Sequence, residues 1–139
     1  GQILLQKNTL INKDSVDEYT YNEWDTGYNL RYTRPFLDTH FSNTVRFRLS
    51  EMVGHHEIKW HIDTDTSVAC RAQICLGTND SVFEFKDRSG VHQLQMRPGE
   101  LWFINTGWNH RVISGTTLRR TAVFSFHFDD VIEKTILYK

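Results

Sequence analysis

The sequence predicts an all-β fold, and three observations carry this prediction. From about residue 44 onward, short segments rich in Val, Ile, Phe and Trp follow one another, as strands do. Clusters of Gly, Pro, Asn, Asp and Ser separate these segments and are typical of turns. No long run of apolar residues at helical spacing interrupts them. Because 139 residues suffice for one hydrophobic core, we expect a single domain.

Eight strands are expected in this part of the chain. In the first of them, Val45, Phe47 and Leu49 alternate with arginines, which is the period of a strand whose two faces differ. The eight predicted strands are 44–49, 57–61, 68–76, 81–86, 91–96, 100–104, 110–113 and 118–128. Eight such strands in sequence fit two packed sheets, the cupin-like double-stranded β-helix or jelly roll.

The predicted core covers residues 44–128, between an N-terminal cover segment at 1–43 and a C-terminal tail at 129–139. The tail could form a helical turn or an added edge strand. In the cover segment, residues 14–21 could form a short helix and residues 28–32 a strand.

Two further features of the cover segment bear on the fold. Arg34-Pro35 favours an extended turn, because a residue before proline avoids helical geometry. The segment is also dense in aromatic residues, which either pack on a sheet or line the mouth of a pocket, packing being the commoner role. They are Tyr19, Tyr21, Trp24, Tyr28, Tyr32 and Phe36.

Composition excludes some partners and favours one compartment. A net charge of −1 gives no electrostatic reason to expect a nucleic acid or an anionic membrane. No apolar run approaches the roughly 20 residues that span a bilayer, and the N-terminus lacks the regions of a signal peptide. The first residue is Gly and not Met, which leaves open whether the chain is trimmed or carries a scar. Cys70 and Cys75 lie on opposite faces of one predicted strand, too far apart for a disulfide. Free thiols favour a reducing compartment, so we expect a cytoplasmic protein.

The candidate metal ligands are His61 and Asp63, followed much later by His110. Two residues apart in an extended segment, His61 and Asp63 project to one side and can converge on one ion. His110 strengthens this weak motif, because the second and seventh strands of a double-stranded β-helix are neighbours. Two imidazoles and one carboxylate occupy one face of an octahedral Fe(II) ion. Asp65 is a rival carboxylate that lies farther from His61. Structural or surface roles are expected for His40, His55, His56, His92 and His127.

Arg120 follows His110 by ten residues and is the candidate anchor for a second carboxylate. Arg119 lies on the opposite, more polar face of the predicted strand. Because the apolar face should point inward, we expect Arg120 to be buried and to need an anionic partner, either a ligand or an internal ion pair. That apolar face comprises Ala122, Phe124 and Phe126.

Arg71 and Gln73 raise a similar question in the third predicted strand. They share one face, opposite Ala72, Ile74 and Leu76. That face could be exposed to solvent or could form the polar floor of a cavity, and the pattern alone leaves both open.

The order and spacing of these motifs resemble one family over residues 45–128, the aspartyl/asparaginyl β-hydroxylases among the Fe(II)/2-oxoglutarate oxygenases. The matching motifs are Ser50-Glu-Met-Val-Gly54, His61, Arg71-Ala-Gln73, Pro98-Gly99-Glu-Leu-Trp-Phe103, His110 and Arg120. The resemblance implies that the iron ligands and catalytic residues are His61, Asp63 and His110. It implies that the residues binding 2-oxoglutarate include Ser50, Arg71, Gln73 and Arg120. Ser50 and Arg120 would hold the distal carboxylate of the co-substrate.

Three departures from the family pattern matter. Gln73 stands where the family often has His, so its role is open. His61 and Arg71 are ten residues apart rather than nine, which weakens the role of Arg71. Asp63 stands where the hydroxylase that names the family has Gly, whereas bacterial relatives keep the acid. The chain therefore looks closer to the complete-triad branch, which includes proline cis-4-hydroxylases.

The resemblance implies an enzyme that uses Fe(II), 2-oxoglutarate and O2 to hydroxylate a C–H of an amino acid or peptidyl side chain, releasing succinate and CO2. Two alternatives stay open: a cupin-type metal-binding enzyme or sensor without 2-oxoglutarate, and a metal-free jelly-roll module for a small ligand. Cupins usually present His-x-His and a downstream Glu, unlike His61-Ile62-Asp63. Trp102 and Trp108 are candidates for the pocket wall. We expect a small-molecule or peptidyl substrate and neither nucleic acid nor membrane as partner.

Overall fold

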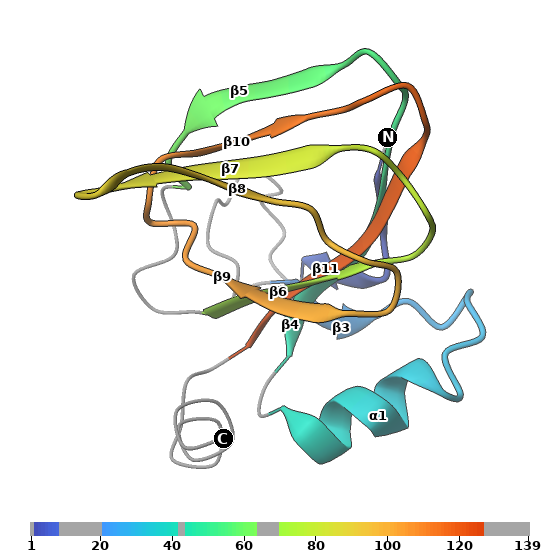
Figure 1. Cartoon of the computed structure of the whole chain (residues 1–139). Helices are drawn as coiled ribbons and strands as arrows, with labels where there is room; N and C mark the ends of the chain where they lie inside the picture. Colours follow the sequence, from blue (N-terminus) through green and yellow to red (C-terminus); the bar gives the residue numbers. More distant parts are fainter. Residues whose placement is uncertain (1, 9–20, 42–43, 64–69, 127–139) are drawn as a thin grey trace.

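The computed structural model describes residues 2–8, 21–41, 44–63 and 70–126, and eleven strands and one short helix lie in these ranges (Figure 1). The N-terminal elements are β1 (Gln2–Leu4), β2 (Gln6–Asn8), β3 (Tyr21–Trp24) and α1 (Thr33–His40). The following strands are β4 (Val45–Met52), β5 (Glu57–His61), β6 (Cys70–Cys75), β7 (Val82–Asp87), β8 (Gly90–Leu94), β9 (Leu101–Ile104), β10 (His110–Ile113) and β11 (Arg119–Phe126).

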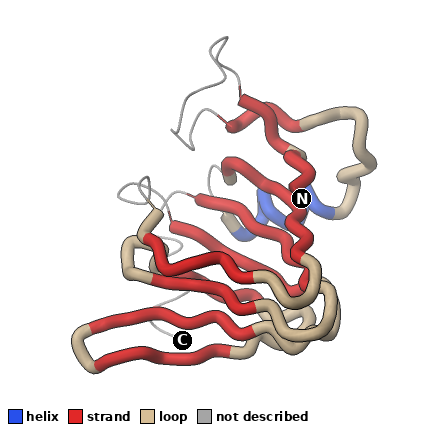
Figure 2. The backbone as a smooth tube through the Cα atoms, turned by 90° about the horizontal axis from the view of Figure 1, so that it is seen from above, coloured by secondary structure: helices blue, strands red, loops and turns tan. Residues whose placement is uncertain are grey.

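The last eight strands are divided between two facing sheets. The larger sheet has the order β1-β4-β11-β6-β9, and the smaller has the order β5-β10-β7-β8. Figures 1 and 2 show the two sheets stacked as layers, with their strands joined at the edges by loops. Strands that alternate between two sheets in this order form a jelly roll. The fold class predicted from the sequence is therefore confirmed.

The larger sheet is covered on both faces. On the side away from the smaller sheet, Phe47 and Phe124 pack in one apolar cluster with Leu37 of α1 and with Phe41, which follows the helix. Leu37 is 1% exposed, and Figure 1 shows α1 on this outer side. The main apolar core thus lies outside the jelly roll, beneath the helix.

The space between the two sheets is filled only in part by apolar side chains. A second cluster contains Met52, Cys75, Phe83, Met96 and Val112. Cys75 is a buried free thiol. Polar and charged side chains line the rest of this space, so the inside of the jelly roll is a cavity rather than the main core.

Two expectations for the N-terminal segment are wrong. Residues 28–32 form no strand, and Arg34-Pro35 lies inside α1 rather than in an extended turn. Pro35 occupies the first turn of the helix, where a backbone N–H has no acceptor within the helix, so the missing donor costs little. Burial of Leu37 in the core then favours the helix over the local preference of Arg34.

Other expectations for the N-terminal segment and the tail have mixed outcomes. The sequence did not reveal the short strands β1, β2 and β3. Trp24 packs against Phe47, with ring centroids 5.9 Å apart, whereas Tyr21 lines the cavity. Residues 9–20 and the tail lie outside the described ranges, as does the rival ligand Asp65. Among the described residues, no helix is long and apolar enough to cross a membrane.

Candidate metal centre and its cavity

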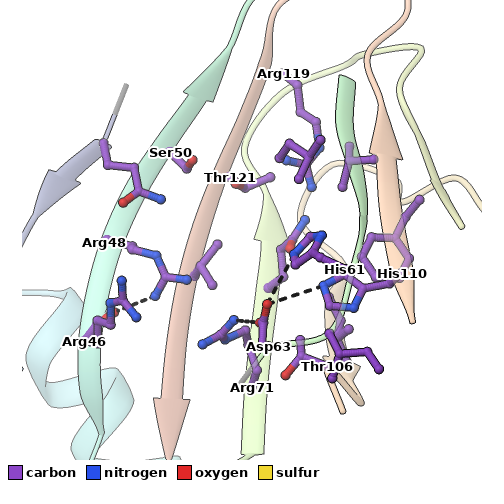
Figure 3. Close-up of a pocket in the computed structure, with 18 of the residues that line it drawn as sticks. Arg46, Arg48, Ser50, His61, Asp63, Arg71, Thr106, His110, Arg119 and Thr121 are labelled. Carbon is purple, nitrogen blue, oxygen red and sulfur yellow. Dashed lines mark hydrogen bonds and ion pairs between the residues drawn. The ribbon is translucent and has the colours of Figure 1, made fainter. Parts of the chain in front are cut away.

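His61, Asp63 and His110 converge on one point of the cavity wall (Figure 3). His61 and His110 are paired residues on the adjacent strands β5 and β10, so their side chains project from the same face. Oδ1 of Asp63 lies 3.2 Å from Nε2 of His61 and 3.7 Å from Nε2 of His110. The three ligand atoms all lie within 4.8 Å of one another.

The two imidazoles are held in the tautomer that a metal requires. Nδ1 of His61 lies 2.7 Å from the carbonyl oxygen of Lys59, and Nδ1 of His110 lies 2.8 Å from that of Trp108. A carbonyl oxygen only accepts hydrogen bonds, so each Nδ1 carries the proton and donates it. Each Nε2 therefore faces Asp63 and the cavity, where a metal could bind it.

Asp63 is fixed by its backbone and by its second carboxylate oxygen. Its backbone N–H donates to the carbonyl oxygen of Thr106 at 3.0 Å, just beyond the end of β5. Nη1 of Arg71 forms an ion pair with Oδ2, which leaves Oδ1 directed at the two histidines. Arg71 therefore lies beside the carboxylate of Asp63 and fixes its orientation.

The three side chains fit a divalent transition metal. Two ligands that are each about 2.1 Å from an ion, at right angles, lie about 3 Å apart, close to the spacing of the nitrogen and oxygen atoms here. Two imidazoles and one carboxylate suit Fe(II) and leave coordination positions for other ligands. His110 is buried and His61 half-buried, so the open side of the group faces the cavity.

The cavity has a volume of about 560 Å³, within the usual range for small-molecule sites. Its described lining contains four arginines: Arg46 and Arg48 of β4, Arg71 of β6 and Arg119 of β11. Asp63 contributes the one acidic side chain of this lining. The described part of the lining is therefore cationic, although the chain as a whole has a charge of −1.

The expectation that Arg120 faces inward is wrong. Its side chain is 61% exposed on the outer face of the larger sheet, where Nε donates to Oε2 of Glu51 at 2.9 Å. Arg119 is the arginine that lines the cavity, and it is only 8% exposed. The apolar face of β11 is indeed buried, but under α1 and not inside the jelly roll, so the opposite face of the strand meets the cavity.

Arg119 lies among hydroxyl groups rather than carboxylates. Thr121, two residues along β11, is paired with Ser50 of β4, and both line the cavity. Within the described ranges, the guanidinium of Arg119 has no ion pair or hydrogen bond, and Oγ1 of Thr121 is buried without a hydrogen-bond partner. Burial lowers the pKa of Arg119, since its charged form loses water, yet a guanidinium stays protonated at neutral pH.

The other predicted site residues also line the cavity. Ser50 is half-buried there, and Gln73 is buried with its amide donating to Sδ of Met96 at 3.5 Å. Of the two environments considered for the Arg71–Gln73 face, the polar cavity floor is the observed one. Trp108 is 45% exposed and stacks on Phe85, outside the cavity lining.

Sequence reasoning missed Arg119 and Thr121 as cavity residues, and also Arg46 and Arg48. The alternation in β4 and β11 was visible, and it grouped these side chains correctly on one face of each strand. What the alternation could not reveal was which face meets the cavity, because a helix from a distant segment covers the apolar one. The sequence did contain one signal that could have identified these cavity residues, namely the arginines on the polar faces of the strands that became β4 and β11.

Comparison with solved structures supports the fold. A 2OG-Fe(II) oxygenase family protein from Burkholderia pseudomallei shares 18% identity, with a TM-score of 0.55 over 71% of this chain and 53% of that one. This chain thus spans about half of that oxygenase. A cupin domain from Bordetella pertussis matches at 16% identity over 61% of this chain and 82% of its own length, with a TM-score of 0.46. A predicted oxalate decarboxylase from Thermotoga maritima matches at 12% identity over 68% and 74%, with a TM-score of 0.45.

Comparison by sequence gives no counterpart: no protein-family model and no curated protein matches the chain. The solved structures share only its fold at these identities, and the two TM-scores below 0.5 carry no further argument. The chain thus has a jelly-roll fold, and its converging His-Asp-His group could hold a metal ion.

Proposed function

We propose that this protein is a non-haem Fe(II)- and 2-oxoglutarate-dependent dioxygenase that hydroxylates a C–H of an amino acid or peptidyl side chain. The observation that carries the proposal is Arg119, a buried guanidinium with no anionic partner in the described ranges, in the same cavity as three metal ligands. A buried charge of this kind is costly unless an anion pairs with it. A ligand carboxylate meets that need.

The residues divide into two groups that suit the two ends of 2-oxoglutarate. His61, Asp63 and His110 would hold Fe(II), to which the keto-acid end binds. Arg119 would bind the distal carboxylate with its guanidinium fork, and Thr121 would donate its hydroxyl hydrogen to the same group. The described lining offers no other acid that could neutralise Arg119.

When bound, Fe(II) supplies the dioxygen chemistry in which 2-oxoglutarate is oxidised to succinate and CO2 while a substrate C–H is hydroxylated. The protein contributes positioning and exclusion of water. Arg71 keeps Oδ1 of Asp63 directed toward the metal position by holding Oδ2. The carbonyl oxygens of Lys59 and Trp108 orient both imidazoles so that Nε2 faces the metal position.

An anaerobic titration with Fe(II) and then 2-oxoglutarate tests the proposal. We expect the visible charge-transfer band of the iron–2-oxoglutarate chelate in the wild type and its loss in His110→Ala. His56→Ala is the matched control, since His56 is exposed and lies outside the cavity lining. Its band should equal that of the wild type.

The two alternative functions predict different results in the same titration. Iron binding without the band would favour a cupin-type enzyme or sensor that does not use 2-oxoglutarate. No metal binding at all would leave a jelly-roll module for a small ligand and would end the proposal.

A further inference from the structure

A buried hydroxyl beside the metal centre has no role in the function proposed above. Thr106 lies in the loop between β9 and β10 and lines the cavity. It is 4% exposed, and within the described part of the chain its Oγ1 has no hydrogen-bond partner. Burying a hydroxyl without a partner is unfavourable, because the hydrogen bonds that it made to water are lost. We therefore expect this oxygen to contact a bound molecule.

Backbone hydrogen bonds fix the position of Thr106 without using its hydroxyl. Its carbonyl oxygen accepts from the backbone N–H of Asp63 at 3.0 Å, and its own N–H donates to the carbonyl oxygen of Ile104 at 3.1 Å. The same loop carries Trp108, whose carbonyl oxygen accepts from Nδ1 of His110. One loop thus holds two of the three candidate metal ligands and places Thr106 next to them, with its hydroxyl left available to a ligand.

Thr106 and Arg119 lie on opposite sides of the metal group. Arg119 begins β11, whereas Ser125, near the other end of that strand, is paired with Arg71 of β6. Arg71 is in turn paired with Ile104 of β9, which precedes Thr106 by two residues. Figure 3 shows Arg119 above the two histidines and Thr106 below them. A ligand that reaches Arg119 from the metal position therefore turns its other end toward Thr106.

This arrangement suits the two ends of 2-oxoglutarate. The molecule is a linear diacid, and the proposed function puts its distal carboxylate at Arg119 and Thr121. Its other carboxylate belongs to the keto-acid end, which binds the metal, and so it lies on the side of Thr106. A carboxylate that binds a metal keeps lone pairs that accept hydrogen bonds. Such a bond is stronger than one to a neutral acceptor, because the carboxylate is charged.

We propose that the hydroxyl of Thr106 donates a hydrogen bond to the metal-bound carboxylate of 2-oxoglutarate. The inference rests on the proposed function and deepens it, because it adds a protein contact at the keto-acid end of the co-substrate. Thr121 and Thr106 then play equivalent parts at the two ends of one ligand: each is a buried hydroxyl that gains its partner only when the ligand binds.

Two keto acids test the contact without turnover. The protein is loaded with Zn(II), which does not react with dioxygen, and calorimetry measures its affinity for 2-oxoglutarate and for pyruvate. Pyruvate has the keto-acid end and lacks the distal carboxylate. Thr106→Val keeps the shape of the side chain and removes the hydroxyl. We expect this variant to bind both acids about 10-fold more weakly, because each loses a hydrogen bond to a charged group.

Thr121→Val is the matched control, since it makes the same chemical change at the distal end. It should weaken 2-oxoglutarate binding and leave pyruvate binding unchanged. Thr106→Ser, which keeps a hydroxyl, should bind both acids within threefold of the wild type. Wild-type affinity for pyruvate in Thr106→Val would overturn the inference. A loss in that variant restricted to 2-oxoglutarate would also overturn it, because the hydroxyl would then act at the distal end.

Unfolding of the metal-free protein excludes a purely structural role. The hydroxyl of Thr106 has no partner before a ligand binds, so its removal costs the fold no hydrogen bond. Thr106→Val should therefore unfold at the same urea concentration as the wild type or at a higher one. A lower midpoint would show that the hydroxyl supports the fold, and the inference would fail.

Failure of the proposed function gives a different result. If the wild-type Zn(II) protein binds pyruvate but not 2-oxoglutarate, the oxygenase proposal fails. A weaker binding of pyruvate by Thr106→Val then still supports the contact with a metal-bound carboxylate. If 2-oxoglutarate binds the wild type and Thr106→Val equally well, the oxygenase proposal stands and the inference is wrong. Binding of neither acid to the wild type would overturn both.

Discussion

Arg119 and Arg120 are neighbours in sequence with the same side chain and different surroundings. Arg119 is buried in the cavity beside Thr121, whereas Arg120 is exposed and paired with Glu51. An exposed ion pair of this kind contributes about 0–1 kcal/mol to stability. The two residues therefore offer a test in which the chemical change is identical and only its location differs.

Replacement of each arginine by methionine should separate the two locations. Arg119→Met should weaken 2-oxoglutarate binding about 10- to 100-fold, because a hydrogen bond to a charged group contributes roughly 1.5–3 kcal/mol. Arg120→Met should change the affinity less than twofold. Titration of the Fe(II) protein with 2-oxoglutarate, followed by the charge-transfer band, measures both. Equal losses would show that the effect of Arg119 is on the general charge of the protein and not on a bound carboxylate.

At the residue scale, the sequence was sufficient to find the three side chains of the candidate metal site. The spacing of His61 and Asp63 in an extended segment is local information, and His110 follows from the order of strands in a jelly roll. The sequence did not show that Arg119, rather than Arg120, lines the cavity. The pattern of β11 groups its residues by face, but it does not show what covers each face. Only the packing of Leu37 and Phe41 against Phe124 determines that.

At the scale of elements, the loops at residues 76–81 and 114–118 are fastened together by one carboxylate. Asp80 accepts hydrogen bonds from the backbone N–H and the hydroxyl of both Thr116 and Thr117, at 2.7–3.0 Å. These four donors hold the pKa of Asp80 well below its usual range. One loop connects β6 to β7 and the other connects β10 to β11, so each loop runs between the two sheets. The hydrogen bonds of Asp80 join these two loops to each other.

Gly115 makes this clamp possible. A Cβ at Gly115 would lie 2.2 Å from the carboxylate carbon of Asp80, so Gly115→Ala should lower the free energy of unfolding by roughly 1–3 kcal/mol. Gly77→Ala is the matched control, because no atom lies within 4 Å of a Cβ built there. Urea unfolding of the two variants measures the difference. A Gly115→Ala protein as stable as Gly77→Ala would mean that the clamp contributes little.

At the scale of the whole molecule, metal binding should add to stability. The ligands come from β5, from the segment after it and from β10, so an ion would link elements that an unfolded chain separates. At a free Zn(II) concentration 100 times its dissociation constant, the free energy of unfolding should rise by about 2.7 kcal/mol. Thermal or urea unfolding with and without a chelator measures this increase.

His61→Ala provides the control for that prediction. The variant should unfold like the metal-free wild type and should gain no stability from Zn(II), because two of the three ligands remain but no longer enclose the ion. An equal gain in the variant would place the bound metal elsewhere on the chain.

The overall fold was predictable because its signals are short-range. Turn residues bound each of the eight strands, and β5 and β10 coincide with the predicted segments 57–61 and 110–113. The N-terminal elements were not predictable in the same way. Three of them are strands of three or four residues, too short to show a period, and α1 exists because its buried Leu37 completes a core built by distant strands.

The double covering of the larger sheet has a consequence for protein engineering. In β11, the even-numbered residues from 122 to 126 belong to the apolar core, whereas the odd-numbered residues 119, 121 and 123 line the cavity. Alternate residues of this one strand thus have separate roles: one set packs in the core and the other set lines the cavity. A combinatorial library confined to the odd positions could change ligand selectivity while sparing the aromatic packing, so this strand suits directed evolution.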